Sequence, residues 1–165
     1  MLRPMVIWTL AVDSSTNSPI VILKEIDGER TLPIWIGLLE ATVIATEMQG
    51  IKFARPLTHD LLKNIIELIE VKVKKVEICD LKEDTYYALI HINYNGREIA
   101  LDARPSDALA LALRVNAPIF AVEEVIQNAR QVQIRKIPKD QPEQEKKWKE
   151  ILEDLDPEDF GKYKM

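Results

Sequence analysis

Two glycine-containing dipeptides set the strongest limit on how this chain can fold. Asp27-Gly28 and Asn95-Gly96 each lie between runs that are rich in β-branched and aromatic residues. Such a pair tolerates the positive φ of a tight turn, so each one predicts a β-hairpin. The strand-like runs form two groups of three: Met5 to Val12, Ile20 to Ile26 and Thr31 to Ile36, then Val71 to Leu81, Tyr86 to Tyr94 and Glu98 to Ala103.

Three segments beside these strands have helical periodicity. Leu38 to Met48 is followed by Gly50, which is placed to end a helix. Thr58 is the expected N-cap of a second helix. Pro105 suits the first position of a third helix, in which Ala108 to Leu113 is apolar on every side, so this helix should be central or covered by a partner subunit. The second helix carries the clearest apolar stripe: Leu61, Leu62, Ile65, Ile66 and Ile69.

The remaining segments complete an α+β fold. A short buried strand is expected at Pro118 to Val122 and a short helix at Glu123 to Ala129, before an irregular basic stretch up to Lys139. Gln141 to Leu155 is helical in propensity and amphipathic, so it should dock. We therefore predict a mixed, largely antiparallel sheet with helices packed on it. One compact domain would occupy residues 1–138, and a charged C-terminal helical tail residues 139–165.

Composition narrows the functional classes. Apolar residues make up 47% of the chain and charged residues 30%, which is typical of a globular protein. Cys79 is the only cysteine, so the chain cannot form an internal disulfide or a cysteine-based zinc site, and a cytoplasmic location is expected. There is no apolar run of about 18 residues, so no membrane insertion is predicted. The net charge of −5 does not by itself favour a nucleic-acid partner.

Two similar segments carry the chemistry-bearing residues. Arg55 to Leu62 reads RPLTHDLL and Arg104 to Leu109 reads RPSDAL, so each combines Arg-Pro with a hydroxyl, an acid and apolar residues. Proline, hydroxyl and acid all suit the start of a helix. An arginine there is unfavourable unless it pairs with an acid or faces an anion. Acids, a histidine and two arginines at neighbouring helix starts would suit phosphodiester chemistry.

Three stretches resemble the bifunctional nuclease domain family. They are LPIWIG at Leu32 to Gly37 with Glu40 just after it, RPLTHDLL at Arg55 to Leu62, and DARPSDALALALR at Asp102 to Arg114. The resemblance extends from about Met5 to about Ile126, and its two Arg-Pro motifs are specific. It implies a mixed α+β domain that works as a homodimer and cleaves both RNA and DNA with the help of a metal.

The resemblance makes a nuclease of low sequence specificity our first hypothesis. The candidate catalytic residues are acids and one histidine: Glu40, His59, Asp60, Asp102 and Asp107. The candidate phosphate-binding residues are two arginines and a hydroxyl: Arg55, Arg104 and Ser106. The candidate ligands of a divalent metal such as Mg²⁺ or Mn²⁺ are three of the acids: Asp60, Asp102 and Asp107.

The alternative hypothesis is a non-catalytic dimeric module. Its paired arginines would bind an anionic ligand, nucleic acid or a partner protein, and the acids would be counter-ions. Arginines enclosed by carboxylates would favour the module, whereas an open acidic cleft would favour catalysis. Glu40 then complements a helix dipole, and His59 is an exposed surface or capping residue.

The other candidate residues have structural interpretations. His91 belongs to a solvated sheet face and Cys79 is a small buried apolar residue. Three tryptophans are expected to pack in the core rather than stack on bases: Trp8, Trp35 and Trp148. Four bases in the segment after residue 129 could follow a phosphate backbone or be solvated: Arg130, Arg135, Lys136 and Lys139.

Overall fold

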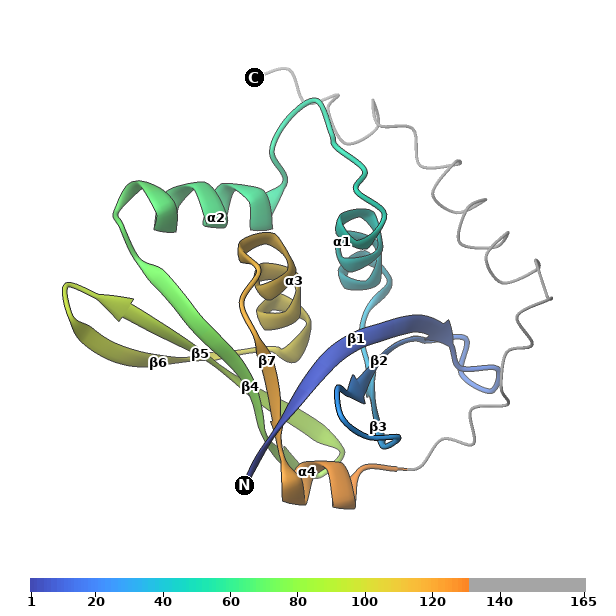
Figure 1. Ribbon diagram of the computed structural model, residues 1–165. Coiled ribbons are helices and arrows are strands. Elements are labelled where there is room, and N and C mark those ends of the chain that lie inside the picture. Colours follow the sequence, from blue (N-terminus) through green and yellow to red (C-terminus); the bar gives the residue numbers. More distant parts are fainter. Residues whose placement is uncertain (131–165) are drawn as a thin grey trace.

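One sheet organises the fold. A computed structural model describes residues 1–130 of the 165-residue chain (Figure 1). Within them, seven strands lie in the order β3-β2-β1-β7-β4-β5-β6. One antiparallel group contains β1 (Leu2–Val12), β2 (Pro19–Glu25) and β3 (Thr31–Trp35), and a second contains β4 (Lys72–Lys82), β5 (Thr85–Tyr94) and β6 (Arg97–Ala103). β7 (Ile119–Val122) joins the groups, antiparallel to β1 and parallel to β4. The predicted mixed, largely antiparallel α+β fold is confirmed.

The two predicted hairpins both form, with different turns. Asn95 and Gly96 have φ of 51° and 79°, and they alone connect β5 to β6, as expected for a tight turn. β2 and β3 are joined by five residues, 26–30, and Gly28 does not have a positive φ. The hairpin predicted at Asp27-Gly28 is therefore confirmed, but the tight turn with a positive φ at Gly28 is not found. Pro33 lies in β3, an edge strand, where its missing N–H costs least.

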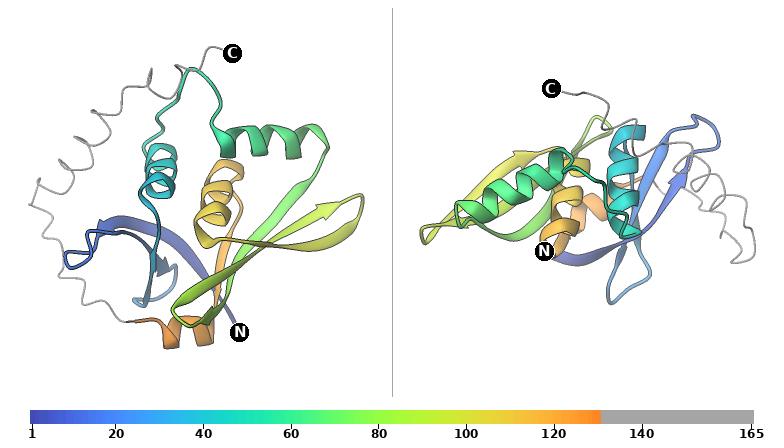
Figure 2. Two further views of the ribbon diagram at one scale, coloured as in Figure 1. Left: turned by 180° about the vertical axis from the view of Figure 1, so that it is seen from behind. Right: turned by 90° about the horizontal axis from the view of Figure 1, so that it is seen from above.

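Three helices lie next to one another along one side of the sheet (Figures 1 and 2). They are α1 (Leu38–Met48), α2 (Thr58–Leu68) and α3 (Pro105–Val115). The expected bounds of α1 and the first-position proline of α3 are confirmed. In α3, Ala108, Leu109, Ala110 and Leu111 are each at most 3% exposed within this chain. The helix is therefore central, and no partner subunit is needed to cover it.

α2 differs from the sequence prediction in two ways. Its N-cap is Leu57 rather than Thr58, because the Asp60 carboxylate accepts the Leu57 N–H over 2.9 Å and so does the capping. The helix also has no buried residue, and its apolar stripe is mostly exposed to solvent. The polar side of the helix faces α3 instead, through His59. The amphipathic pattern is present, but of its apolar stripe only Ile66 packs against the core.

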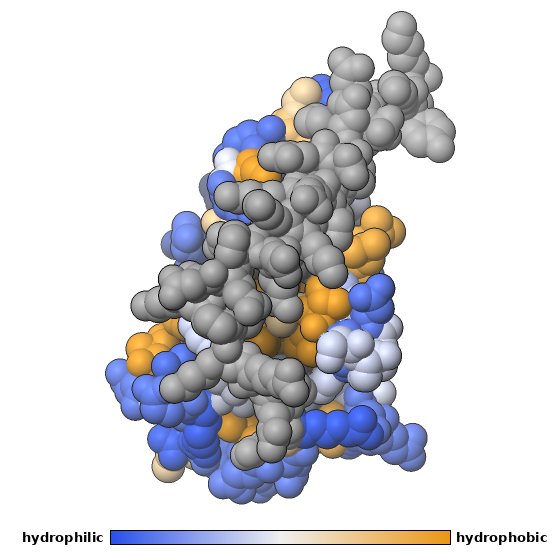
Figure 3. Space-filling view, turned by 90° about the vertical axis from the view of Figure 1, so that its right-hand side faces the viewer, coloured by the Kyte–Doolittle hydropathy of each residue, from blue (hydrophilic) through white to orange (hydrophobic). Residues whose placement is uncertain are grey.

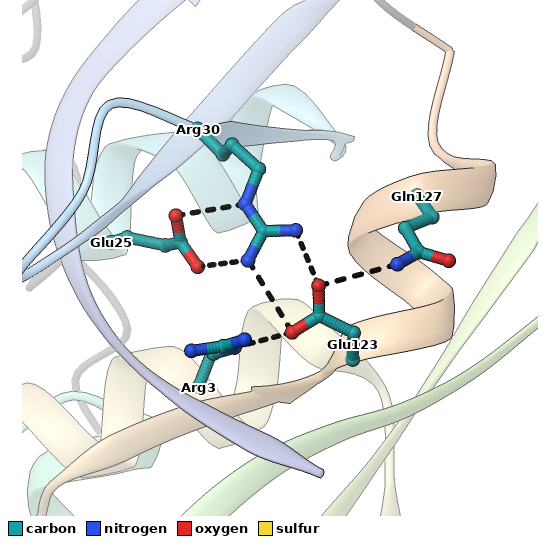
Figure 4. A network of polar contacts seen from close by, with 5 residues as sticks. All are labelled: Arg3, Glu25, Arg30, Glu123 and Gln127. Atoms are coloured by element: carbon teal, nitrogen blue, oxygen red, sulfur yellow. Dashed lines mark hydrogen bonds and ion pairs between the residues drawn. The ribbon is translucent and has the colours of Figure 1, made fainter.

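A short fourth helix ties the end of the described chain to its beginning. α4 (Glu123–Asn128) starts directly after β7, close to the predicted Glu123 to Ala129. The Glu123 carboxylate binds both Arg3 and Arg30, and Arg30 also binds Glu25 (Figure 4). These arginines lower the pKa of Glu123 to about 2. The network links β1, the β2–β3 hairpin and α4.

Several other expectations can be checked in the described residues. Trp35 is half-buried and donates to Asp13, but Trp8 is 51% exposed, so the core position expected for Trp8 is wrong. Cys79 is half-buried, and His91 lies beside Glu77 on the sheet face without helices. Figure 3, which views the side of the molecule that carries β1–β3, shows apolar residues among charged ones.

Within residues 1–130, no helix has the length and apolarity needed to cross a membrane. The predicted boundary at residue 138, the helix from Gln141 to Leu155, Trp148 and the basic residues after Arg130 lie outside the described residues. Arg130 itself pairs with Asp84.

Candidate functional site

The starts of three helices bring four of the predicted residues together. Arg104, directly before α3, donates from Nε to Asp107 Oδ2 over 2.8 Å. Its Nη1 donates to Oε1 of Glu40, in the first turn of α1, over 3.0 Å. His59, in the first turn of α2, places Nε2 3.0 Å from Asp107 Oδ1. We call these four residues the Arg104 cluster.

The local sequence explains how this cluster is built. Pro105 fixes φ at the first position of α3, so the chain enters the helix with Arg104 still extended at φ −67° and ψ 142°. Gly37 is the N-cap of α1, and a Cβ at this position would collide with the Glu40 carboxylate. The absence of a side chain at Gly37 therefore leaves room for the carboxylate. The LPIWIG and Arg-Pro motifs contribute to one site.

In the Arg104 cluster, Asp107 stays ionised next to the exposed guanidinium group of Arg104. Burial raises the pKa of Asp107, but hydrogen bonds from Arg104 and His59 lower it by more, so the pKa lies below its ordinary value of 3.8. The Arg104 side chain is 65% exposed although two carboxylates bind it. The pairing with acids accounts for an arginine at a helix N-terminus. Its exposure leaves guanidinium N–H groups available to a third anion.

A pocket of about 290 Å³ opens at this cluster. Glu40 and Arg104 line it together with Ser106, which is 7% exposed. Trp35 and Tyr86 add aromatic walls, and burial raises the pKa of Tyr86 to about 12, so its hydroxyl stays protonated at neutral pH. The pocket therefore offers a cation, the two carboxylates of Glu40 and Asp84, and hydroxyl groups to a bound molecule.

His59 is less accessible than the sequence predicted. Its side chain is 14% exposed, so the exposed surface histidine expected at this position is wrong. Nε2 faces Asp107, and Nδ1 is buried without a hydrogen-bond partner among the residues described. The histidine is enclosed because α2 turns its polar side toward α3. In this arrangement His59 orients Asp107 and does not itself face the pocket.

Asp60, the acid in the first turn of α2, belongs to a different cluster of charged residues. Asp60 Oδ1 accepts from Arg114 Nε over 2.7 Å, and Arg114 Nη2 lies 3.9 Å from Glu47 Oε2. The Arg114 side chain is 3% exposed and also donates to the Ala110 carbonyl. Burial raises the pKa of Asp60, but its bonds from Arg114 and from the Leu57 N–H lower it by more. This Arg114 cluster binds α1, α2 and α3 to one another.

Two more predicted residues lie away from the Arg104 cluster. Arg55 lines another pocket, with no residue in common with the first, and so does not share an anion site with Arg104. Asp102 pairs with Leu89 in the β5–β6 register, and it acts electrostatically on Cys79. Since neighbouring Ala103 packs against the core, Asp102 points to the opposite face of the sheet.

The predicted metal ligands do not form one site. Asp60 is bound to Arg114, Asp107 to Arg104, and Asp102 lies on the other sheet face. Within residues 1–130, no group of three or more histidine, cysteine or acidic side chains is arranged to hold an ion. These three aspartates therefore do not fit a shared divalent metal as the sequence suggested.

Sequence reasoning did not assign a role to Arg114 or Glu47. A signal was present, because Arg114 follows the apolar run of α3 directly. A charged residue on a helix that is buried all round needs a partner, and Glu47 and Asp60 are its neighbours.

Comparison with known proteins identifies the family. A model of the bifunctional nuclease domain matches residues 21–133, which include all three motifs. The fold and site thus define an α+β domain with an exposed arginine among acids, and the chain belongs to the bifunctional nuclease domain family.

The relatives differ in how much of their length this chain covers. An uncharacterized protein of Mycobacterium tuberculosis is 40% identical over 92% of this chain and 93% of its own length. Bifunctional nuclease 1 of Oryza sativa subsp. japonica is 28% identical over 70% of this chain but only 36% of its own length. Bifunctional nuclease 1 of Arabidopsis thaliana is 27% identical over 61% of this chain and 32% of its own. The chain thus spans about a third of these plant proteins.

Proposed function

We propose that the protein is a nuclease that hydrolyses phosphodiester bonds of RNA and DNA with low sequence specificity. The family membership and the names of the plant relatives support the reaction class. The observation that carries the assignment to a site is the position of Arg104, exposed at a pocket and held between Glu40 and Asp107. A guanidinium group binds phosphate oxygens strongly and stays charged at all relevant pH values.

The residues of the Arg104 cluster divide the work in this proposal. Arg104 binds a non-bridging phosphate oxygen and neutralises charge that develops there. Glu40 lines the pocket and is the candidate base that accepts a proton from the attacking water. Asp107 holds Arg104 through two N–H groups, and His59 holds Asp107. Asp107 and His59 are therefore positioning residues.

Assistance by Mg²⁺ or Mn²⁺ stays a prediction. The aspartates expected to bind the ion are separated among two clusters and a sheet face, so no step of the proposed mechanism is assigned to a metal. The cleavage test is therefore carried out both with and without added metal.

The test is cleavage of labelled single-stranded RNA and DNA, with and without Mg²⁺ or Mn²⁺. Wild type is compared with Asp107→Ala, and Asp27→Ala in an exposed loop is the matched control. All three are purified identically. We expect activity to fall on the order of 100-fold in Asp107→Ala and to stay unchanged in the control. Equal traces of cleavage in all three preparations would indicate contamination and reject the proposal.

The non-catalytic module is the second candidate, and one observation favours it. Both carboxylates next to Arg104 are already engaged with it, as counter-ions would be. The module predicts that the folded protein binds a labelled oligonucleotide, that Arg104→Ala weakens this binding, and that no cleavage occurs with any metal. Fluorescence anisotropy and the cleavage assay distinguish the two candidates.

We also propose that the chain forms a homodimer through α2. The apolar side chains along its outer side are each between 40% and 82% exposed: Leu61, Leu62, Ile65, Leu68 and Ile69. They expose on the order of 400 Å² of apolar surface, the size of patch that marks an interface. Two copies would bury about twice that area, which fits a standard interface once a polar rim is added. A second copy supplies a matching surface by symmetry.

Light scattering at micromolar concentration tests the dimer. The wild type should have twice the chain mass, and Ile65→Glu should reduce it to the chain mass. Ile26→Glu, at a position that is 57% exposed outside α2, is the matched control and should remain dimeric. A wild type with the mass of one chain at this concentration would contradict the proposal.

A further inference from the structure

A second pocket, separate from the one at Arg104, is unusually basic. It has a volume of about 230 Å³ and lies among the end of α1, the connection 49–57, the first turns of α2 and the end of α3. Half of the polar residues that line it are bases: Lys52, Arg55, Lys63 and Arg114. We call it the basic pocket.

The charges around the basic pocket do not balance. Four basic and two acidic residues line it, so there is an excess of two positive charges. Both acids, Glu47 and Asp60, lie against Arg114 at the buried side. Of the cations nearer to solvent, Lys52 acts electrostatically on Asp60, but neither Lys52 nor Arg55 forms an ion pair with a lining carboxylate.

Arg55 has no structural explanation in the described residues, and Lys52 has only a slight one, because its charge helps to lower the pKa of Asp60. Neither makes an ion pair or hydrogen bond with another residue in the described part of the chain, and both are exposed. Lys63 reaches Glu67 only over 3.8 Å, and the two side chains are 36% and 58% exposed, so this pair neutralises Lys63 weakly. Among the described arginines, only Arg97 also lacks an ion pair, and it is the first residue of β6, outside both pockets. Arg55 is therefore the one unpaired arginine that faces a pocket.

Size and charge together select the ligand class. The basic pocket is smaller than the roughly 300–1,000 Å³ of pockets for drug-sized molecules, so it suits a compact group. A terminal phosphate carries about −1.5 to −2 charges near pH 7, which matches the excess of two positive charges better than a singly charged phosphodiester. Asn64 adds an amide that can donate to a phosphate oxygen.

The pocket also has an apolar side. Ile51 is 37% exposed at its rim, and Phe53 lies next to it in the lining. A sugar or a base attached to the phosphate would contact these residues. We propose that the basic pocket binds the terminal phosphate of a nucleotide, with Lys52 and Arg55 as the principal contacts.

The basic pocket is connected to the Arg104 cluster through a single turn of helix. Asp60 lines the basic pocket, and the preceding residue, His59, contacts Asp107. The proposed binding does not require that the protein cleaves nucleic acid, because none of the pocket residues belongs to the Arg104 cluster. Binding and cleavage can therefore be tested independently.

Isothermal titration calorimetry of the full chain at low salt is the direct test. The probes are adenosine 5′-monophosphate, adenosine and inorganic phosphate. We expect the monophosphate to bind at least about tenfold more tightly than adenosine, since the phosphate makes the charged contacts. The double variant Lys52→Ala, Arg55→Ala should lose at least about tenfold in affinity for the monophosphate. Arg97→Ala removes an unpaired arginine elsewhere and should bind as the wild type does.

Several outcomes would overturn the proposal. Adenosine binding as tightly as the monophosphate would show that the pocket does not recognise phosphate. An equal loss of affinity in Arg97→Ala would show diffuse electrostatic attraction, and no binding of the monophosphate at millimolar concentration would exclude the site. Thermal unfolding of each variant controls for loss of structure. If Asp107→Ala has no effect on cleavage but monophosphate binding depends on Lys52 and Arg55, only the nuclease proposal fails.

Discussion

The starts of α2 and α3 are similar in sequence and different in the structure. In α3, Arg104 is the N-cap, Pro105 is the first helical residue, and Asp107 binds the arginine before the helix. In α2, the Arg-Pro pair lies ahead of the N-cap, and Asp60 binds the arginine at the end of α3 instead. Similar short motifs can therefore place their acids next to different arginines. Which arginine an acid binds depends on the neighbouring helices as well as on the motif.

Burial separates the two arginines that these acids bind. The Arg114 side chain is 3% exposed and Arg104 is 65% exposed, although each contacts two carboxylates. A buried pair must keep its geometry because an unpaired buried charge is costly, whereas an exposed pair can exchange partners with a ligand. We therefore expect Arg114 to control stability and Arg104 to control function.

Removal of the buried arginine should have the largest effect. Arg114→Ala leaves Asp60 and Glu47 without their cation and opens space between three helices. We expect the free energy of unfolding to fall by about 3 kcal/mol. Urea denaturation measures the change, with Arg104→Ala as the matched control. Equal destabilisation in the two variants would contradict the division between the clusters.

Removal of the exposed arginine should affect activity instead. Arg104→Ala should lower cleavage on the order of 100-fold, because the phosphate loses its cation, while stability changes by less than about 1 kcal/mol. Arg104→Lys keeps the charge but cannot bind Glu40 and Asp107 in the same fork, so its rate should be intermediate. Initial rates on single-stranded RNA provide the measurement. Full activity in Arg104→Ala would remove this residue from the site.

The acid sensitivity of Asp60 should give a smaller effect. The pKa of Asp60 in the folded protein lies below its ordinary value of 3.8, so its stabilising contribution is complete above about pH 4 and is lost as pH falls through the folded pKa. Asp60→Asn should therefore be less stable than the wild type at pH 7, and the difference should narrow at pH 3. Urea denaturation at both pH values tests this. Asp27 makes no ion pair among the residues described. The difference in stability between Asp27→Asn and the wild type should therefore be the same at pH 7 and pH 3.

The smallest expected effect concerns Gly37. A Cβ at this position meets the Glu40 carboxylate, a flexible group that can move away. Gly37→Ala should thus change stability by less than about 1 kcal/mol and reduce cleavage several-fold, on the scale of a lost exposed contact. A rate equal to that of the wild type would show that the position of Glu40 is not limiting.

Short sequence signals predicted the helices, strands and turns well. They predicted less well which side of each element packs against the core. Asn95-Gly96 and Pro105 act through their own φ angles, so the structure agrees with the sequence at both places. The stripe of α2 predicted an amphipathic helix, but the side that packs depends on the contact of His59 with Asp107, 48 residues away. Asp102 is only two residues before Arg104, yet strand alternation directs it to the other face. Contacts between distant segments decided these cases.

The place of β7 in the sheet has a consequence for synthesis of the chain. β1 and β4 each pair with β7, which is made only at residues 119–122. During translation, the β1–β3 and β4–β6 groups can each form from nearby segments, but they cannot be joined until β7 has left the ribosome. We therefore expect nascent chains that end before β7 to expose the unpaired edges of β1 and β4, and to depend on chaperones until this strand arrives.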